Sequence, residues 1–219
     1  KNAELLIDHA WGWEPCTIAA IKAYKPQSSS LGSGQVLQCP YPHQKARLVL
    51  REMAEQLALD LVDKGLVTDQ LVLTVGFDIE NLTDPARRKL YRGPVATDHY
   101  GRQIPKHGHG SENLGGHTSS GKQLLEAATA LFDRIAPPEL LVRKLSLSAN
   151  HVILESQAVK ADSGPEQLDL FTDYSVLEQE EKARQTEQEK ERRMQQTMIS
   201  IKKKFGKNAI LKGMSLEEG

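Results

Sequence analysis

The chain has 219 residues, a formal net charge of −1, and 39% hydrophobic and 26% charged residues. This composition supports one sizeable core with appendages, and a membrane span is excluded because no window holds about eighteen uncharged apolar residues. No apolar signal segment is present, and Cys16 and Cys39 stand apart from any Cys-x-x-Cys spacing. We therefore expect a cytoplasmic protein with reduced thiols, no metal site and no membrane partner.

The first residues, 1–25, indicate the end of a small helical unit. Apolar residues recur there at helical spacing, namely Ala3, Leu6, Ile7, Ala10, Ile18 and Ile21, with Pro15 opening the second helical turn. The sequence enters this pattern directly at Lys1 without a methionine, which we interpret as a piece of a longer protein. A Ser- and Gly-rich linker follows and leads into a strand toward Cys39.

The segment Val67 to Asp78 predicts a strand with two different faces. Leu71, Leu73, Val75 and Phe77 point one way, and Val72, Thr74, Gly76 and Asp78 point the other. Amphipathic helices are predicted on either side of it in the sequence, at Pro42–Lys64 and at Ser120–Ile135, where Ser120 and Gln123 form a capping-box pattern.

A last strand is predicted where Leu145, Leu147 and Ala149 alternate with Lys144, Ser146 and Ser148. The expected fold is α+β: a two-layer βαββαβ domain over residues 26–158, with a four-stranded sheet and two helices on one face. The other face of the sheet is left free to bind a ligand.

The region Glu80 to Ser119 is rich in basic residues, glycine and histidine. Its cations are Arg87, Arg88, Lys89, Arg92, Arg102 and Lys106, and its histidines are His99, His107, His109 and His117. A basic, flexible hairpin of this kind suits a polyanion, because Lys and Arg release counterions when they bind phosphates. The alternative is a solvated long loop. No recognisable ligand spacing surrounds the histidines, so a metal site is not predicted.

The chain beyond Gln157 is polar, and we interpret residues 159–172 as a linker that contains an apolar pentapeptide, Gln167-Leu168-Asp169-Leu170-Phe171. Exposed Leu and Phe side chains in a linker favour docking in a partner's pocket, and the alternative is that they pack on the protein's own helices. Residues 173–219 predict a charged helix and a tail, with Met194, Met198, Ile201 and Phe205 forming a packing stripe.

Three segments carry a family resemblance: Ser28 to Cys39, Tyr100-Gly101-Arg102-Gln103-Ile104-Pro105-Lys106, and Gly115 to Ser120. They resemble the C-terminal part of Y-family lesion-bypass DNA polymerases, and most closely bacterial UmuC-like repair proteins. The resemblance implies that residues 1–25 end a thumb domain and that residues 26–158 form a DNA-binding little-finger domain. It also implies that Gln167 to Phe171 is a sliding-clamp-binding peptide of the Q-L-x-L-F type.

In that family, nucleotidyl transfer uses metal-binding carboxylates of a palm domain, which would lie upstream of Lys1. The resemblance therefore implies no catalytic residue and no cofactor in this chain, with Mg²⁺ expected in the missing catalytic domain of a DNA-directed DNA polymerase. The expected partners are duplex primer-template DNA and the sliding clamp. The expected DNA-binding residues are Ser30, Ser33, Arg102, Lys106, Arg143, Lys144 and Ser146, and they would hold phosphates without reading base edges.

Two other functions remain open from the residues alone. A non-catalytic RNA-binding module can share the βαββαβ fold, although only 5% of the residues are aromatic. A protein-interaction scaffold that works through the charged C-terminal helix is the other.

Overall fold

The computed structural model describes residues 2–24, 29–161, 174–206, 208–210 and 213. Its helices are α1 (Asn2–Ala10), α2 (Ile18–Ala23), α3 (His43–Asp63), α4 (Glu80–Thr83), α5 (Pro85–Leu90), α6 (Gly121–Ile135), α7 (Glu155–Ala161) and α8 (Tyr174–Phe205). Its strands are β1 (Leu31–Tyr41), β2 (Leu66–Phe77), β3 (Val95–Thr97), β4 (Gln103–Pro105), β5 (Gly108–Thr118), β6 (Val142–Asn150) and β7 (Ile153–Leu154).

The main sheet has the strand order β1-β6-β2-β5, with β7 pairing with β2. All of these pairs are antiparallel. The last predicted strand, β6, therefore inserts between the first two, after α3 has connected β1 to β2 and α6 has connected β5 to β6. The predicted α+β fold and its βαββαβ order are confirmed, and β7 is an addition to it.

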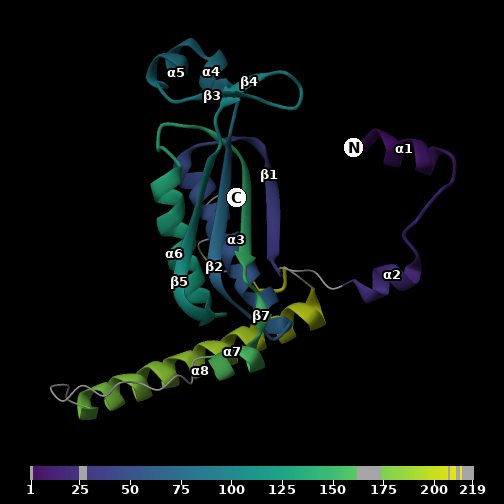
Figure 1. Cartoon of the computed structure of the whole chain (residues 1–219). Coiled ribbons are helices and arrows are strands. Elements are labelled where there is room, and N and C mark those ends of the chain that lie inside the picture. The colour runs from purple at the N-terminus through teal and green to yellow at the C-terminus, as the bar shows by residue number, and fades with distance from the viewer. Residues whose placement is uncertain (1, 25–28, 162–173, 207, 211–212, 214–219) are drawn as a thin grey trace.

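Helices α3 and α6 cover one face of the sheet (Figure 1). Leu71, Leu73 and Val75 of β2 are fully buried there, together with Leu50 and Leu61 of α3 and Leu124, Leu131 and Phe132 of α6. The alternation along β2 explains this arrangement, because every second side chain meets the helices. The predicted apolar face of 67–78 is therefore the core face.

The two covering helices begin and end where the sequence supplies local signals. The hydroxyl of Ser120 accepts a hydrogen bond from the backbone N–H of Gln123 at 3.3 Å, which caps the first turn of α6. After α3, Gly65 has φ +63°, a left-handed conformation that glycine adopts without steric cost. Both caps lie within the predicted helix ends.

The basic region between β2 and β5, residues 78–107, is here called the excursion, and it has more structure than a simple hairpin. It contains α4, α5 and the separate β3–β4 hairpin, and Figure 1 shows these elements gathered at one end of the main sheet. Asn81, which is 1% exposed, ties the start of the excursion to the residues just before β6. The side-chain amide of Asn81 donates to the carbonyl oxygens of Asp78 and Leu141 and accepts from the N–H of Leu141, each at 2.9 Å. The histidine-rich end of the region forms β5, a strand whose position the residue pattern did not locate.

Two appendages flank this domain. In α1 and α2 the large apolar side chains are exposed, including Leu6, Trp11, Trp13 and Ile21. The long helix α8 packs against α3 at the opposite end of the sheet from the β3–β4 hairpin (Figure 1). Among the described residues, no helix is both long and apolar enough to cross a membrane.

Candidate nucleic-acid interface

The sheet face opposite α3 and α6, here called the outer face, is built from aligned rows of small and polar residues. The strand register places Gly34, Ser146, Thr74 and His109 in one row across β1, β6, β2 and β5. The next row contains Gly32, Ser148, Val72 and Ser111, and a third brings Val36 and Gly76 beside Lys144. None of these residues is Phe, Tyr, Trp, Asp or Glu.

The outer face is nearly flat where glycines of one strand lie close to the neighbouring strand. A Cβ atom added to Gly32 would lie 2.7 Å from the Cβ of Ser148, and one added to Gly76 would lie 3.2 Å from the Cβ of Lys144. Glycine at these positions keeps side chains from standing above the backbone. A ligand can therefore approach the strands closely, as a sugar-phosphate backbone requires when it is held by amides and hydroxyls.

The described residues do not plug this face with apolar groups. Val36 is 65% exposed, and the side chains of Lys144 and His109 are exposed as well. Ser146, Ser148 and Thr74 are half-buried by their neighbours in the sheet, and the hydroxyl of Thr74 lies 2.9 Å from Nδ1 of His109. Helix α8 packs on the helix layer through α3 and α6, which leaves the outer face open.

A hollow of about 460 Å³ lies at the end of the outer face next to the excursion. Arg102 from the hairpin and Arg143 and Lys144 from β6 all line it, together with two acids, Asp78 and Asp98. Three of the predicted DNA-binding residues therefore meet at one place, although Arg102 lies far from the other two in the sequence. Asp98 and Asp78 pair with Arg102 and Arg143 there, so Lys144 is the cation of the hollow with no carboxylate partner among the described residues.

Arg143 is directed by an irregularity in β6. Gly76 pairs with Lys144 whereas Phe77 pairs with Val142, so Arg143 is the extra residue of a β-bulge. Its guanidinium donates to the carbonyl oxygen of Gln38 at 3.0 Å, and its Nε lies 3.8 Å from a carboxylate oxygen of Asp78. These two contacts hold Arg143 at the rim of the hollow.

Arg102 is held in the tip of the β3–β4 hairpin by Asp98. The Asp98 carboxylate accepts hydrogen bonds from the N–H groups of Tyr100 and Arg102, each at 2.9 Å, and from Nε of Arg102 at 2.7 Å. These hydrogen bonds, first of all the one from the Arg102 backbone, lower the pKa of Asp98 despite some desolvation. Asp98 is therefore ionised at neutral pH, and the hydrogen bonds that it accepts order the turn.

The other predicted DNA-binding residues are placed differently. Ser146 is on the outer face, in the row of Gly34. Ser33 pairs with Leu147, and its side chain therefore belongs to the helix-side face, although it is exposed at the sheet edge. Ser30 is exposed just before β1, and Lys106 is exposed just after β4, where its N–H donates to the carbonyl oxygen of Pro94 at 2.8 Å.

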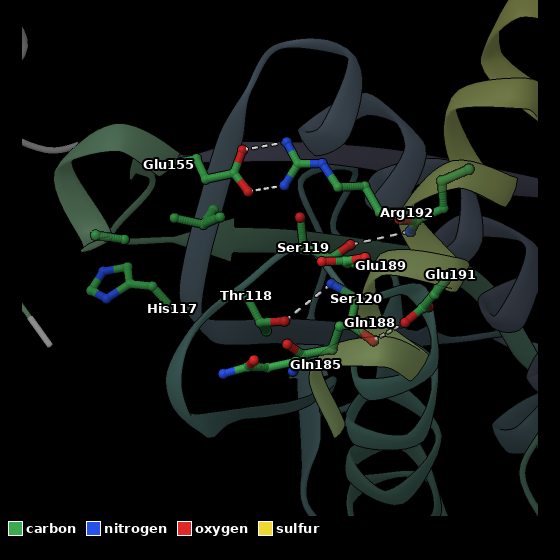
Figure 2. Close-up of a pocket in the computed structure, with 13 residues that line it drawn as sticks. His117, Thr118, Ser119, Ser120, Glu155, Gln185, Gln188, Glu189, Glu191 and Arg192 are labelled. Carbon is green, nitrogen blue, oxygen red and sulfur yellow. Dashed lines mark hydrogen bonds and ion pairs between the residues drawn. The ribbon is translucent and has the colours of Figure 1, made fainter. Parts of the chain in front are cut away.

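The predicted clamp-binding residues Gln167, Leu168, Asp169, Leu170 and Phe171 lie outside the described residues. The helices on either side of them are described, and Figure 2 shows where α7 and α8 meet around a pocket of about 400 Å³. Arg192 of α8 donates two hydrogen bonds to the two carboxylate oxygens of Glu155 in α7. The hydrogen bonds from Arg192 lower the pKa of Glu155, against a smaller opposing effect of burial.

Further polar contacts seat α8 on the start of α6. Glu191 accepts hydrogen bonds from the hydroxyl of Ser120 at 2.8 Å and from the N–H of Lys122 at 3.0 Å, and the buried Gln195 donates to the carbonyl oxygen of Ser119 at 3.2 Å. The predicted apolar stripe contributes less than expected, because Met194 is 57% exposed and Phe205 68% exposed. Helix α8 therefore docks mainly by hydrogen bonds and ion pairs.

The described residues contain no group of three or more His, Cys, Asp or Glu side chains arranged to hold a metal ion. Thr74 lies on the outer face, as the alternation along residues 67–78 predicts. The outer-face residues that the sequence missed are Gly32, Gly34, Ser111 and His109. Only the pairing register across four strands identifies them, and a single strand's alternation does not supply it.

Comparison with known proteins identifies the family. The family model of the impB/mucB/samB family C-terminal domain matches residues 28–170. The fold and this match define the chain as the C-terminal part of a Y-family DNA polymerase. It belongs to the impB/mucB/samB family, because the matched residues make up more than half of the 219. The family resemblance predicted from Ser28–Cys39 and Tyr100–Lys106 is thereby confirmed.

A solved structure described as a complex of beta-clamp processivity factor and the little finger domain of PolIV is similar to this chain, with a TM-score of 0.36 and 11% sequence identity. The similarity covers 66% of this chain and 100% of the solved one. No curated protein matches the sequence.

Proposed function

We propose that this chain is the duplex-holding, little-finger portion of a UmuC-like polymerase that copies past DNA lesions. The observation that carries the proposal is the open outer face, whose low Gly, Ser and Thr rows end at Arg102, Arg143 and Lys144. Such a face binds phosphates through backbone amides, hydroxyls and a few cations, without reading bases. Grip that is independent of sequence is what a polymerase requires as it moves along its template.

The net charge of −1 is compatible with this grip because the charges are unevenly placed. The outer-face rows contain no acid, and the two acids at their end, Asp78 and Asp98, are paired with Arg143 and Arg102. Glu187, Glu189 and Glu191 lie on α8, at the opposite end of the sheet from the hairpin. Only a few phosphates are contacted, so we expect weak duplex binding that falls steeply with salt.

The test is fluorescence anisotropy with a labelled blunt duplex, titrated at several salt concentrations. Lys144→Ala is expected to weaken binding and to lower the slope of log affinity against log salt by about one. Lys64→Ala is the matched control, since Lys64 is exposed at the far end of α3 and away from the outer face. Binding that is indifferent to salt, or equally affected by the two variants, rejects the phosphate grip.

We also propose that Gln167 to Phe171 docks the protein on a sliding clamp, on the basis of the Q-L-x-L-F pattern in this sequence. Leu170→Ala with Phe171→Ala is expected to abolish clamp binding and leave duplex affinity unchanged, because the apolar anchors are lost. Leu5→Ala with Leu6→Ala removes two exposed leucines of α1 and is the control. Clamp binding that survives the first double variant removes the docking assignment.

The RNA-binding alternative is tested by competition between duplex DNA and single-stranded RNA for the wild-type chain. RNA readers of this fold stack bases on aromatic side chains of the sheet, and the three outer-face rows carry no Phe, Tyr or Trp. We therefore expect duplex DNA to displace RNA from the outer face. The scaffold alternative predicts instead a partner whose capture depends on Met198 and Ile201 of α8.

A further inference from the structure

The excursion exposes one aromatic side chain, Tyr100, at the tip of the β3–β4 hairpin. It is 79% exposed, whereas Tyr91 in the same excursion is 9% exposed and donates its hydroxyl to the carbonyl oxygen of Pro94 at 2.6 Å. Tyr91 supports the fold by packing. Tyr100 buries too little surface to contribute in that way, so its ring is accessible to a ligand.

The turn presents Tyr100 in a fixed position. Asp98 accepts hydrogen bonds from the N–H groups of Tyr100 and Arg102, the carbonyl oxygen of Arg102 accepts from the N–H of Asp98 at 2.9 Å, and Gly101 takes φ +78°. At the other end of the hairpin, β4 contacts both α4 and β2. A side chain on such a preorganised turn loses little conformational entropy when a ligand binds.

The surroundings of Tyr100 combine aromatic and basic groups. The guanidinium carbon of Arg102 lies 5.1 Å from the centre of the Tyr100 ring, and the His99 ring meets it edge-on at 5.5 Å between centroids. Arg92 and Lys106 are exposed in the same excursion, and within the part of the chain that the structure describes neither side chain forms an ion pair. Aromatic rings interleaved with cations are the chemistry by which proteins hold unpaired bases and their phosphates.

We propose that the hairpin tip, residues 99–102, is a binding site for an unpaired nucleobase of single-stranded DNA. Tyr100 stacks on the base, Arg102 and His99 fix the Tyr100 ring, and Arg92 and Lys106 attract the adjacent phosphates. Arg102 also lines the hollow at the end of the outer face, which brings the site next to Lys144. The site goes beyond the proposed duplex grip, because its ligand is a base outside the duplex and its binding does not require the outer face.

The experiment measures binding of the full chain to a labelled oligothymidylate of about 12 nucleotides, a length typical of single-strand binding sites. Tyr100→Ala is expected to weaken this binding about fivefold or more, the loss typical of one stacked base. Tyr100→Phe retains the ring and is expected to bind as the wild type does. Tyr24→Ala, which removes a tyrosine that is 73% exposed in the N-terminal appendage, is expected to have no effect.

An abasic strand of the same length separates stacking from charge, since it keeps the phosphates and lacks the bases. The wild type is expected to bind it as weakly as Tyr100→Ala binds the oligothymidylate, with no further loss when the variant meets the abasic strand. A blunt duplex is expected to bind equally to the wild type and to Tyr100→Ala.

Three results overturn the proposal: no binding of the oligothymidylate by the wild type, unchanged binding by Tyr100→Ala, or an equal loss on the thymidylate and abasic strands. Failure of the duplex grip gives a different pattern, in which the blunt duplex fails to bind while the oligothymidylate still responds to Tyr100→Ala.

Discussion

Arg192 of α8 donates hydrogen bonds to both carboxylate oxygens of Glu155 in α7, and this pair joins two helices that flank the predicted clamp-binding peptide. The two side chains are 46% and 34% exposed, so we expect the pair to stabilise the docked helix by less than about 1 kcal/mol at neutral pH. The pair adds a contact to α7 beside those that Glu187 and Glu191 of α8 make with the start of α6.

The Glu155 pair predicts a pH dependence of α8 docking. Because the pKa of Glu155 is lowered in the folded protein, its contribution is fully present above the ordinary glutamate pKa and is lost as pH falls through the lower, folded value. The protection factors of the α8 amides, which compare the observed exchange rate with the intrinsic rate at each pH, are expected to fall over that window. Glu155→Gln should already exchange faster at neutral pH and should show less of this acid response.

The Asp98 turn predicts a second acid-sensitive element at the other end of the molecule. The pKa of Asp98 is lowered chiefly by the hydrogen bond from the Arg102 backbone, so the turn is expected to stay ordered at neutral pH and to loosen as pH falls through that lowered value. Asp98→Asn removes the negative charge and should speed amide exchange at Tyr100 and Arg102 at neutral pH. Unchanged exchange at both amides would show that the turn does not depend on the carboxylate.

Gly32 and Gly34 of β1 differ in how closely they approach β6, so we expect alanine at the two positions to change stability by different amounts. Gly32→Ala places a Cβ 2.7 Å from the Cβ of Ser148 and 2.9 Å from the carbonyl oxygen of Leu147, and we expect a loss of about 1–3 kcal/mol in the free energy of unfolding. At Gly34 the nearest atom would be 3.7 Å away, so Gly34→Ala should change stability by less than about 0.5 kcal/mol. Urea unfolding of both variants makes the comparison, and equal stabilities would contradict the register of β1.

The hydrogen bonds of Asn81 tie the excursion to Leu141, so we expect their loss to lower the free energy of unfolding. Asn81→Ala leaves the carbonyl oxygen and N–H of Leu141 without their side-chain partner in a buried place, which is expected to lower the free energy of unfolding by about 2–3 kcal/mol. Thermal unfolding measures the loss. Thr83→Ala, at a more exposed position of the same short helix, is the control and should have little effect.

The sequence predicts the parts of this fold that repeat a simple period. Helices α3 and α6 and strands β2 and β6 have apolar residues at regular spacing, and Lys144 and Ser146 lie on the outer face as the alternation of 144–149 indicates. Strand β5 could not be located in advance, because its glycines and histidines have low strand propensity and it is held by pairing with β2.

The candidate site is likewise predicted only in part from the sequence. Arg102, Arg143 and Lys144 were selected one by one, and the structure brings them around one hollow, which depends on a β-bulge and on a separate hairpin that no period reveals. Ser33 is among the predicted DNA-binding residues, but its pairing with Leu147 puts its side chain on the helix-side face. In the glycine-rich start of β1 there is no apolar alternation from which its facing could be read.

The free margin of β1 bears on how the protein avoids aggregating with itself. As the first strand in the order β1-β6-β2-β5, it has hydrogen-bonding groups on one side with no strand beside them in the described chain. A margin of this kind can recruit strands from other molecules and grow into fibrils. Pro40 lacks an N–H, and the pairing of β1 with β6 shifts between Val36 and Tyr41, so the second half of β1 is an irregular template for a further strand. Regular edge-to-edge pairing with another molecule is therefore expected to extend only along residues 31–36.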